Sequence, residues 1–334
     1  MKISDDIIKY FAKLSAPSVK KLMLQALAEY YDPDNIIVGE DTSYIIAKGD
    51  IPVALVAHMD TVFSKPAYEF FHDEKANVLW SPQGLGADDH AGLTAIWSIL
   101  AEGYCPHVIL TDKEEVGGIG ALQLIKDHPT FPFNDLKFLI ELDRQGEKDC
   151  VFYNCENEEF EQYIEAFGFE TAVGTFTDIS VICPVWKIAG VNLSIGYFHE
   201  HSLGEYLNLT YYINTINKVK NILDNVLNTE CPQYKYIPSI LNFYNSEYYA
   251  TSSTMYDMSI KCDKCQELHD YWDMVEISDE TAENTEFICY DCFAKARNIK
   301  LCPHCNDWYK ERKDKNICKK CEVKNKNGKT AIRL

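Results

Sequence analysis

Histidine and acidic residues recur in five short motifs along the first two-thirds of this 334-residue chain. In order, the motifs are His58-Met59-Asp60, Gly86 to Gly92, Glu114 to Gly118, Glu141-Leu142-Asp143 and His199-Glu200-His201. Imidazoles and carboxylates are common zinc ligands in catalytic sites. Two imidazoles, three carboxylates and one spare glutamate would hold a pair of zinc ions that share a water molecule. The motifs therefore predict a two-metal centre.

The first two motifs offer the ligands at the middle of such a centre. His58 would bind one ion through a ring nitrogen, while Asp60 would accept the N–H of the other ring nitrogen and fix the tautomer. Asp88 is the candidate shared ligand, because a carboxylate between two cations offsets their mutual repulsion.

The later motifs complete the two sets of ligands. We expect Asp143 beside the first ion, and Glu115 with His201 beside the second. Glu114 would stay unligated and act as the general base that takes a proton from water. Successive side chains of a strand point to opposite faces, so both glutamates reach one site only if the chain turns there. The glycines Gly117-Gly118 make such a turn easy.

Alternating strands and helices must position these residues. Apolar runs typical of strands buried on both faces occupy residues 52–57, 107–110, 136–142 and 191–195. Shorter strands are expected at 36–38 and 44–47. Helical periodicity occupies 5–31, broken near Pro17, and 91–102, 120–127, 158–167 and 209–226. This alternation predicts an α/β fold with a doubly wound, mostly parallel sheet flanked by helices.

The motifs stand where the predicted strands end. His58 follows one strand, Glu114-Glu115 follow another, Asp143 closes a third and His201 comes shortly after a fourth. Asp88 lies at the start of a helix, where a carboxylate is favoured by the helix dipole. Open α/β sheets bind ligands outside the carboxyl ends of their strands, so we expect these residues to converge.

Three segments resemble the co-catalytic di-zinc exopeptidases, a group of zinc aminopeptidases, peptidase T-like tripeptidases, carboxypeptidases and deacylases. They are Val53 to Val62, Gly84 to Gly92 and Thr111 to Gly118, and the resemblance covers about residues 1–228. It implies a cis peptide bond between Asp88 and Asp89 and gives Asp60 and Glu114 the roles described above. The implied metal ligands are His58, Asp88, Glu115, Asp143 and His201.

Some nearby residues keep two interpretations. His201 is preferred to His199 as the last ligand, because His201-Ser-Leu-Gly-Glu205 resembles the His-x-x-x-Glu pattern of the group, in which Glu205 would support the histidine. Asp178 either lines the cleft or is a turn or cap residue. Arg144 either pairs with a substrate carboxylate or stabilises the loop of Asp143.

The predicted activity is that of a metal-dependent hydrolase. The interval between Asp143 and His201 is too short for the lid domain of the tripeptidase-like branches, so the chain resembles the compact aminopeptidases. We expect an exopeptidase, most simply an aminopeptidase, with two zinc ions or cobalt or manganese in their place. The alternatives are an N-acyl amino acid deacylase on the same metals and a catalytically idle peptidase fold that serves in protein interaction. The substrate would be a peptide or an acylated amino acid.

A second metal-binding region is predicted near the C-terminus, where Cys-x-x-Cys recurs four times. The pairs are Cys262 with Cys265, Cys289 with Cys292, Cys302 with Cys305, and Cys318 with Cys321. This spacing is typical of two Cys₄ structural zinc sites. Sequential sharing of the pairs is favoured over interleaved sharing. Disulfides are a weaker alternative, because we expect a compartment that keeps thiols reduced. Thiol redox chemistry is also weaker, since one catalytic pair would suffice.

Composition and charge bound the remaining expectations. We expect a catalytic domain at 1–228, a tyrosine-rich connector at 229–259, a tandem Cys₄ zinc-ribbon-like module at 260–323 and a basic tail at 324–334. A net charge of −19 argues against nucleic-acid binding by the whole chain. The basic stretch after Phe293 is either a solubilising tail or a contact for nucleic acid or an acidic protein.

Nothing in the sequence predicts a membrane protein. The N-terminus lacks a basic start and an apolar core, and no apolar run approaches the ~18 residues of a membrane span. We therefore expect a cytoplasmic protein.

Overall fold

The chain divides into two compact units, Met1–Glu247 and Tyr248–Leu334. The computed structural model describes residues 5–238, 259–270, 274–278, 285–289, 292, 299–301 and 308–310. Within the described residues, no helix is both long enough and apolar enough to cross a bilayer.

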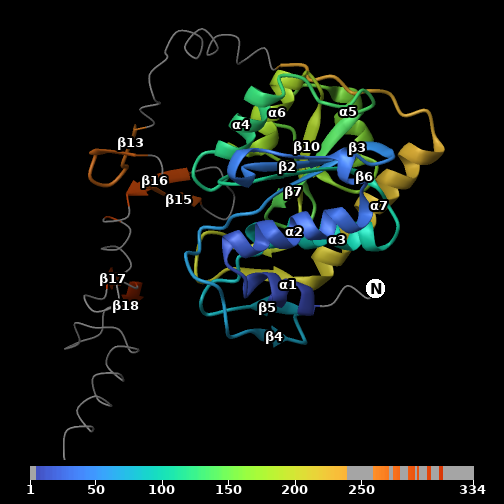
Figure 1. Ribbon diagram of the computed structural model, residues 1–334. Coiled ribbons are helices and arrows are strands. Elements are labelled where there is room, and N and C mark those ends of the chain that lie inside the picture. Colours follow the sequence, from blue (N-terminus) through green and yellow to red (C-terminus); the bar gives the residue numbers. More distant parts are fainter. Residues whose placement is uncertain are drawn as a thin grey trace, which may run out of the picture. The chain divides into compact units, whose positions relative to one another are not determined.

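An eight-stranded sheet runs through the first unit, in the order β1-β2-β6-β3-β7-β10-β8-β9 (Figure 1). Its four central strands are mutually parallel: β6 (Pro106–Thr111), β3 (Ile51–His58), β7 (Phe138–Arg144) and β10 (Gly190–Ser194). The flanking strands are β1 (Ile36–Val38), β2 (Tyr44–Ala47), β8 (Asp149–Val151) and β9 (Glu170–Thr171). The α/β prediction is confirmed. The sheet is mixed, however, because β1, β2 and β8 pair antiparallel with their inner neighbours.

Helices cover both faces of this sheet, which is why its central strands are continuously apolar. The larger core lies under α1 (Asp5–Ala12), α2 (Ala16–Tyr30), α3 (Ala87–Ala101), α5 (Glu158–Glu165) and α7 (Leu209–Asn228). The opposite face is covered by α4 (Ile119–Asp127) and α6 (Asp178–Trp186), as Figure 1 shows. Two short 3₁₀ helices, Pro33–Asn35 and Glu40–Thr42, flank β1.

A second, antiparallel sheet was not predicted. Its strand order is β11 (Tyr197–Phe198), β12 (Tyr206–Asn208), β5 (Val78–Trp80) and β4 (Phe71–Asp73). These strands are too short and too exposed to leave an apolar run in the sequence. The sheet matters for the site. The β11–β12 hairpin carries residues 199–205 at its tip, and β12 pairs with β5, from which the chain leads to Asp88.

Residues 229–238, expected to belong to a connector, are part of the first unit and pack against its core. Tyr234 is buried, and its ring lies against those of Phe138, Phe160 and Tyr163. Its backbone N–H donates to the carbonyl of Lys137. This segment therefore adds an aromatic anchor to the larger core.

In the second unit, the described strands form antiparallel pairs: β13 (Ser259–Lys261) with β14 (Leu268–Asp270), β15 (Met274–Ser278) with β16 (Thr285–Cys289), and β17 (Ile299–Leu301) with β18 (Trp308–Lys310). Several predictions fall outside the described residues: the cysteines Cys302, Cys305, Cys318 and Cys321, most of the basic stretch, and the tail 324–334.

Candidate metal centre

The carboxyl ends of the central strands bring the sequence motifs together. His58 is the last residue of β3 and is level with Thr111, the last residue of β6. Asp143 lies near the end of β7, which pairs with β3 on its other side. Parallel pairing places all three strand ends on one edge of the sheet, as the sequence predicts.

Asp88 lies between two imidazoles. Its Oδ1 is 3.0 Å from His58 Nε2, and its Oδ2 is 3.1 Å from His201 Nε2. Each imidazole also faces a second carboxylate: His58 Nε2 is 3.7 Å from Asp143 Oδ1, and His201 Nε2 is 2.9 Å from Glu115 Oε2. The five residues thus form two groups of one histidine and two carboxylates, with Asp88 common to both.

The two glutamates after β6 sit on a tight turn. Lys113 and Gly117 have positive φ angles of 62° and 99°. Asp60 holds the turn through its two carboxylate oxygens, which accept the backbone N–H groups of Glu114 at 3.1 Å and Glu115 at 3.3 Å. Asp60 Oδ1 is also 3.3 Å from His58 Nδ1, so one carboxylate links the histidine to both glutamates.

The backbone around Asp88 has two particular features, a cis peptide bond and hydrogen bonds to Glu205. The peptide bond between Asp88 and Asp89 is cis, as the resemblance implies. Glu205, expected to support His201, instead accepts the backbone N–H groups of Gly86, Ala87 and Asp88 at 2.5, 3.1 and 3.1 Å. That expectation was wrong, because the β11–β12 hairpin presents Glu205 to the open N-terminus of α3, where unpaired N–H groups attract a carboxylate.

The carboxylate of Asp89, unlike that of Asp88, accepts hydrogen bonds from backbone N–H groups. Its Oδ2 accepts the backbone N–H of His58 at 3.1 Å, and its Oδ1 accepts that of Gly92 at 2.9 Å. A Cβ on Gly92 would lie 2.4 Å from Asp89 Oδ1 and 2.6 Å from the carbonyl oxygen of Leu142, so this close approach requires glycine. Asp89 therefore fixes the end of β3 while Asp88 faces the imidazoles.

Three polar residues that sequence reasoning missed surround Asp143. Tyr197 donates its hydroxyl to Oδ1 at 3.0 Å, and Thr177 donates to Oδ2 at 3.2 Å. Asn192 accepts the backbone N–H of Asp143 at 2.9 Å and donates to its carbonyl at 2.6 Å. A polar residue inside the apolar strand Val191-Asn192-Leu193 was the one available signal for this network.

Residues with two interpretations occupy definite places. The ring of His199 packs edge-on against Tyr206, whereas His201 is the histidine that faces Asp88 and Glu115. Asp178 is fully buried as the first residue of α6 and accepts the hydroxyl of Thr111. Arg144 lies 3.5 Å from Asp149, so it meets an acid of its own loop.

The electrostatics reflect crowded acids. Although burial opposes the shift, hydrogen bonds from His201 and His58 lower the pKa of Asp88. Burial and the charge of Asp88 raise the pKa of Glu115 to about 7. Burial also raises the pKa of Glu114 well above its ordinary value, and the nearby charge of Asp143 adds to this shift.

These residues fit a pair of divalent cations. Two imidazoles and three carboxylates are the donors that catalytic zinc accepts, and they lie in two groups with one shared member. Glu115 Oε1 is buried, and among the described residues it has no hydrogen-bond partner. With Glu114, four carboxylates stand around the two imidazoles. Their excess negative charge is what two dications would neutralise.

A pocket of about 310 Å³ borders this centre. Its lining includes Met59 and Thr61, which flank Asp60 in sequence, and His90, which follows the Asp88-Asp89 pair. Burial lowers the pKa of His90 to about 4, and its ring lies edge-on to Phe11. His90 is thus a neutral imidazole in the pocket wall.

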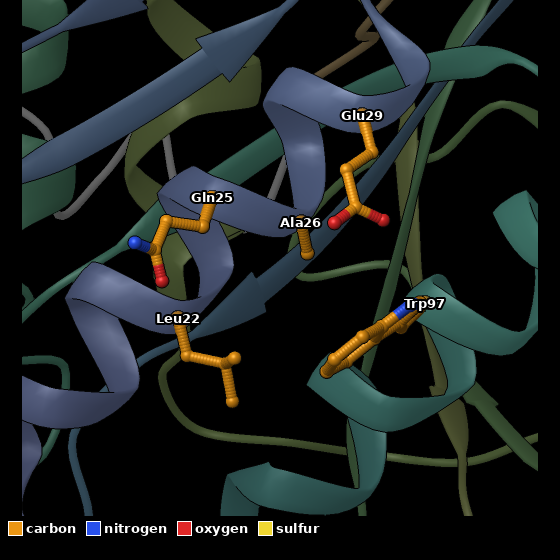
Figure 2. Close-up of a pocket in the computed structure, with 5 residues that line it drawn as sticks. All are labelled: Leu22, Gln25, Ala26, Glu29 and Trp97. Carbon is orange, nitrogen blue, oxygen red and sulfur yellow. The ribbon is translucent and has the colours of Figure 1, made fainter.

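A larger surface hollow, of about 420 Å³, lies elsewhere between α2 and α3. Figure 2 shows the five residues that line it: Leu22, Gln25, Ala26, Glu29 and Trp97. Glu29 is the one charged residue among them. This lining has no group of metal ligands, so the hollow is unrelated to the centre.

No family model and no curated protein matches this sequence. Solved structures do match. Aminopeptidase PepT of Bacillus cereus superposes with a TM-score of 0.52 at 13% identity, over 66% of this chain and 97% of that chain. A tripeptidase of Staphylococcus aureus superposes with a TM-score of 0.52 at 13% identity, over 67% of this chain and 98% of that chain.

A TET aminopeptidase from a marine sediment archaeon of the Thaumarchaeota is similarly close, with a TM-score of 0.51 at 14% identity over 67% of this chain and 98% of that chain. At these identities the likeness establishes a shared fold. The mixed sheet flanked by helices is therefore an architecture that this chain has in common with known aminopeptidases.

Proposed function

We propose that this protein is a metallo-aminopeptidase that uses two divalent cations, zinc by preference and cobalt or manganese as substitutes. The observation that carries the proposal is the position of Asp88, with one oxygen toward each imidazole at 3.0 and 3.1 Å. His58 and Asp143 would hold one ion with Asp88, and Glu115 and His201 the other. The fold shared with known aminopeptidases supports the same activity.

The chain's own residues supply the remaining chemistry. The cations, when bound, would acidify water and withdraw charge from the scissile carbonyl. Glu114 would take the proton from water and pass it to the leaving amine. Asp60 would orient His58. Through its bonds to their backbone N–H groups, it would also fix the positions of the base Glu114 and the ligand Glu115.

The test of this role is the Glu114→Gln variant. It should keep its metal content, because Glu114 is not a proposed ligand, while kcat for peptide hydrolysis falls by ~10²–10⁴. Glu230→Gln, at an exposed residue just beyond the end of α7, is the matched control and should be unchanged. Near-normal turnover by Glu114→Gln would refute the assignment.

A free α-amine distinguishes an aminopeptidase from an N-acyl amino acid deacylase. A peptide substrate of an aminopeptidase has a free α-amine, which an acylated amino acid lacks. We therefore expect hydrolysis of dipeptides with a free amine and little of their acyl-blocked counterparts. The opposite preference would favour the deacylase.

An idle fold is separated from an enzyme by metal stoichiometry. With both predicted cysteine sites filled, about four zinc ions per chain would accompany an intact catalytic centre. About two ions, all bound by cysteine, would accompany an idle fold.

A further inference from the structure

We propose that Cys262, Cys265, Cys289 and Cys292 bind one structural zinc ion through four thiolates. The proposal concerns the second unit and does not depend on the peptidase activity. One sulfur from each of the four residues lies within 4.8 Å of all the others. The structure thus brings together the first and second Cys-x-x-Cys pairs, which the sequence favoured but left open.

The sulfur spacing suits a tetrahedral metal. Four sulfurs at about 2.3 Å from a zinc ion lie roughly 3.8 Å from one another. Cys265 Sγ and Cys289 Sγ are 3.9 Å apart, one from each pair. A disulfide would bring two sulfurs to about 2.05 Å. The geometry therefore favours a metal over an oxidised pair.

The first pair is held by a tight hairpin. Strands β13 and β14 flank the turn, and the backbone N–H of Cys262 donates to the carbonyl of Glu267 at 2.9 Å. The N–H of Gln266 returns to the carbonyl of Cys262 at 2.9 Å, with Gln266 at a positive φ of 63°. These bonds turn the chain so that both cysteine side chains of the pair reach one point.

Backbone N–H groups converge on the sulfur of Cys262. Those of Lys264, Cys265 and Cys289 lie 3.4, 3.5 and 3.3 Å from it. Such donors stabilise a thiolate relative to a thiol, and the thiolate is the form that binds metal. Because Cys289 ends β16, its N–H also ties the second pair to the first.

The first cysteine of each pair is buried. Cys262 is fully buried and Cys289 is 3% exposed, whereas Cys265 is exposed and Cys292 is partly exposed. Small units commonly take much of their folding free energy from such a metal. The zinc would thus be a structural component of the second unit.

Cobalt substitution of the full-length protein tests the site. Thiolate-to-cobalt charge-transfer absorption reports cysteine ligands alone, because the proposed catalytic ligands include no thiolate. Cys262→Ser and Cys289→Ser should each remove one cobalt ion's share of this absorption, and the double variant should remove no more than either single one. Cys231→Ser, outside the four pairs, is the matched control and should leave the absorption unchanged.

A measurement on the unaltered protein guards against misfolded variants. With zinc present, the four cysteines should be protected together from alkylation, and a chelator should expose all four at once. The proposal is overturned if the four alkylate independently of zinc. It is also overturned if the double variant loses two ions' worth of absorption, which would place Cys262 and Cys289 in separate sites.

Discussion

The carboxylate of Glu205 accepts the backbone N–H of Asp88 at 3.1 Å, and so joins the His201 hairpin to the shared aspartate. The same carboxylate accepts the N–H groups of Gly86 and Ala87. One residue on the hairpin therefore positions a proposed ligand from another part of the chain. Its effect should appear in metal binding as well as in turnover.

Glu205→Ala should weaken cation binding at the catalytic centre by ~10–100-fold, because residues that orient ligands commonly contribute that much. Three backbone donors at the start of α3 would lose their acceptor. A titration against a competing chelator measures the affinity, with Glu230→Gln as the control. Unchanged affinity would show that the Asp88 loop keeps its conformation without this carboxylate.

Gly92→Ala should destabilise the fold by about 1–3 kcal/mol or more, since the new methyl group meets the Asp89 carboxylate and the Leu142 carbonyl. The Gly204→Ala variant is a suitable control, because its Cβ would meet only Ser202 Oγ, at 3.5 Å. Denaturant unfolding of both variants measures the difference. Equal stability of the two would mean that Asp89 can move aside without cost.

His107 should make stability depend on pH below neutrality. Its ring is fully buried, Nδ1 accepts the N–H of Gly49 at 3.2 Å, and burial lowers its pKa. The unfolded chain, with a pKa near 6.5, then takes up the proton first as pH falls. Stability is therefore full above about pH 6.5 and is lost as the pH falls toward the lowered pKa of the folded state, by at most ~1.4 kcal/mol per pH unit.

The His107→Asn variant isolates this contribution, because asparagine keeps an acceptor near Nδ1 and does not titrate. The free energy of unfolding of the wild type, minus that of the variant, should decrease between pH 7.5 and pH 5. A difference that stays constant over this range would show that His107 ionises alike in the folded and unfolded chains.

The centre of the fold could be predicted because it rests on long apolar strands whose polar residues stand at the ends. His58 and Asp143 mark the ends of β3 and β7 in the sequence itself, and the parallel pairing of these strands places both residues on the same edge of the sheet. Asp88 lies in the first turn of a helix, as its motif predicted, and between two imidazoles, as its candidate role of shared ligand requires. These features depend on local pattern and on a general rule of sheet topology.

The small sheet and α6 could not be predicted, for a different reason. Strands of two or three residues, such as β11, carry no periodicity, and their pairing partners lie far away in the chain. Helix α6 contains Pro184, which argues against a helix when only sequence is considered. The partner of Glu205 was likewise hidden, because it depends on a long-range approach between the β11–β12 hairpin and α3.

The two imidazoles are sheltered to very different degrees. The side chain of His58 is 1% exposed at the end of a buried strand, whereas that of His201 is 54% exposed at a hairpin tip. If both positions take cations as proposed, the outer one should fill last and empty first.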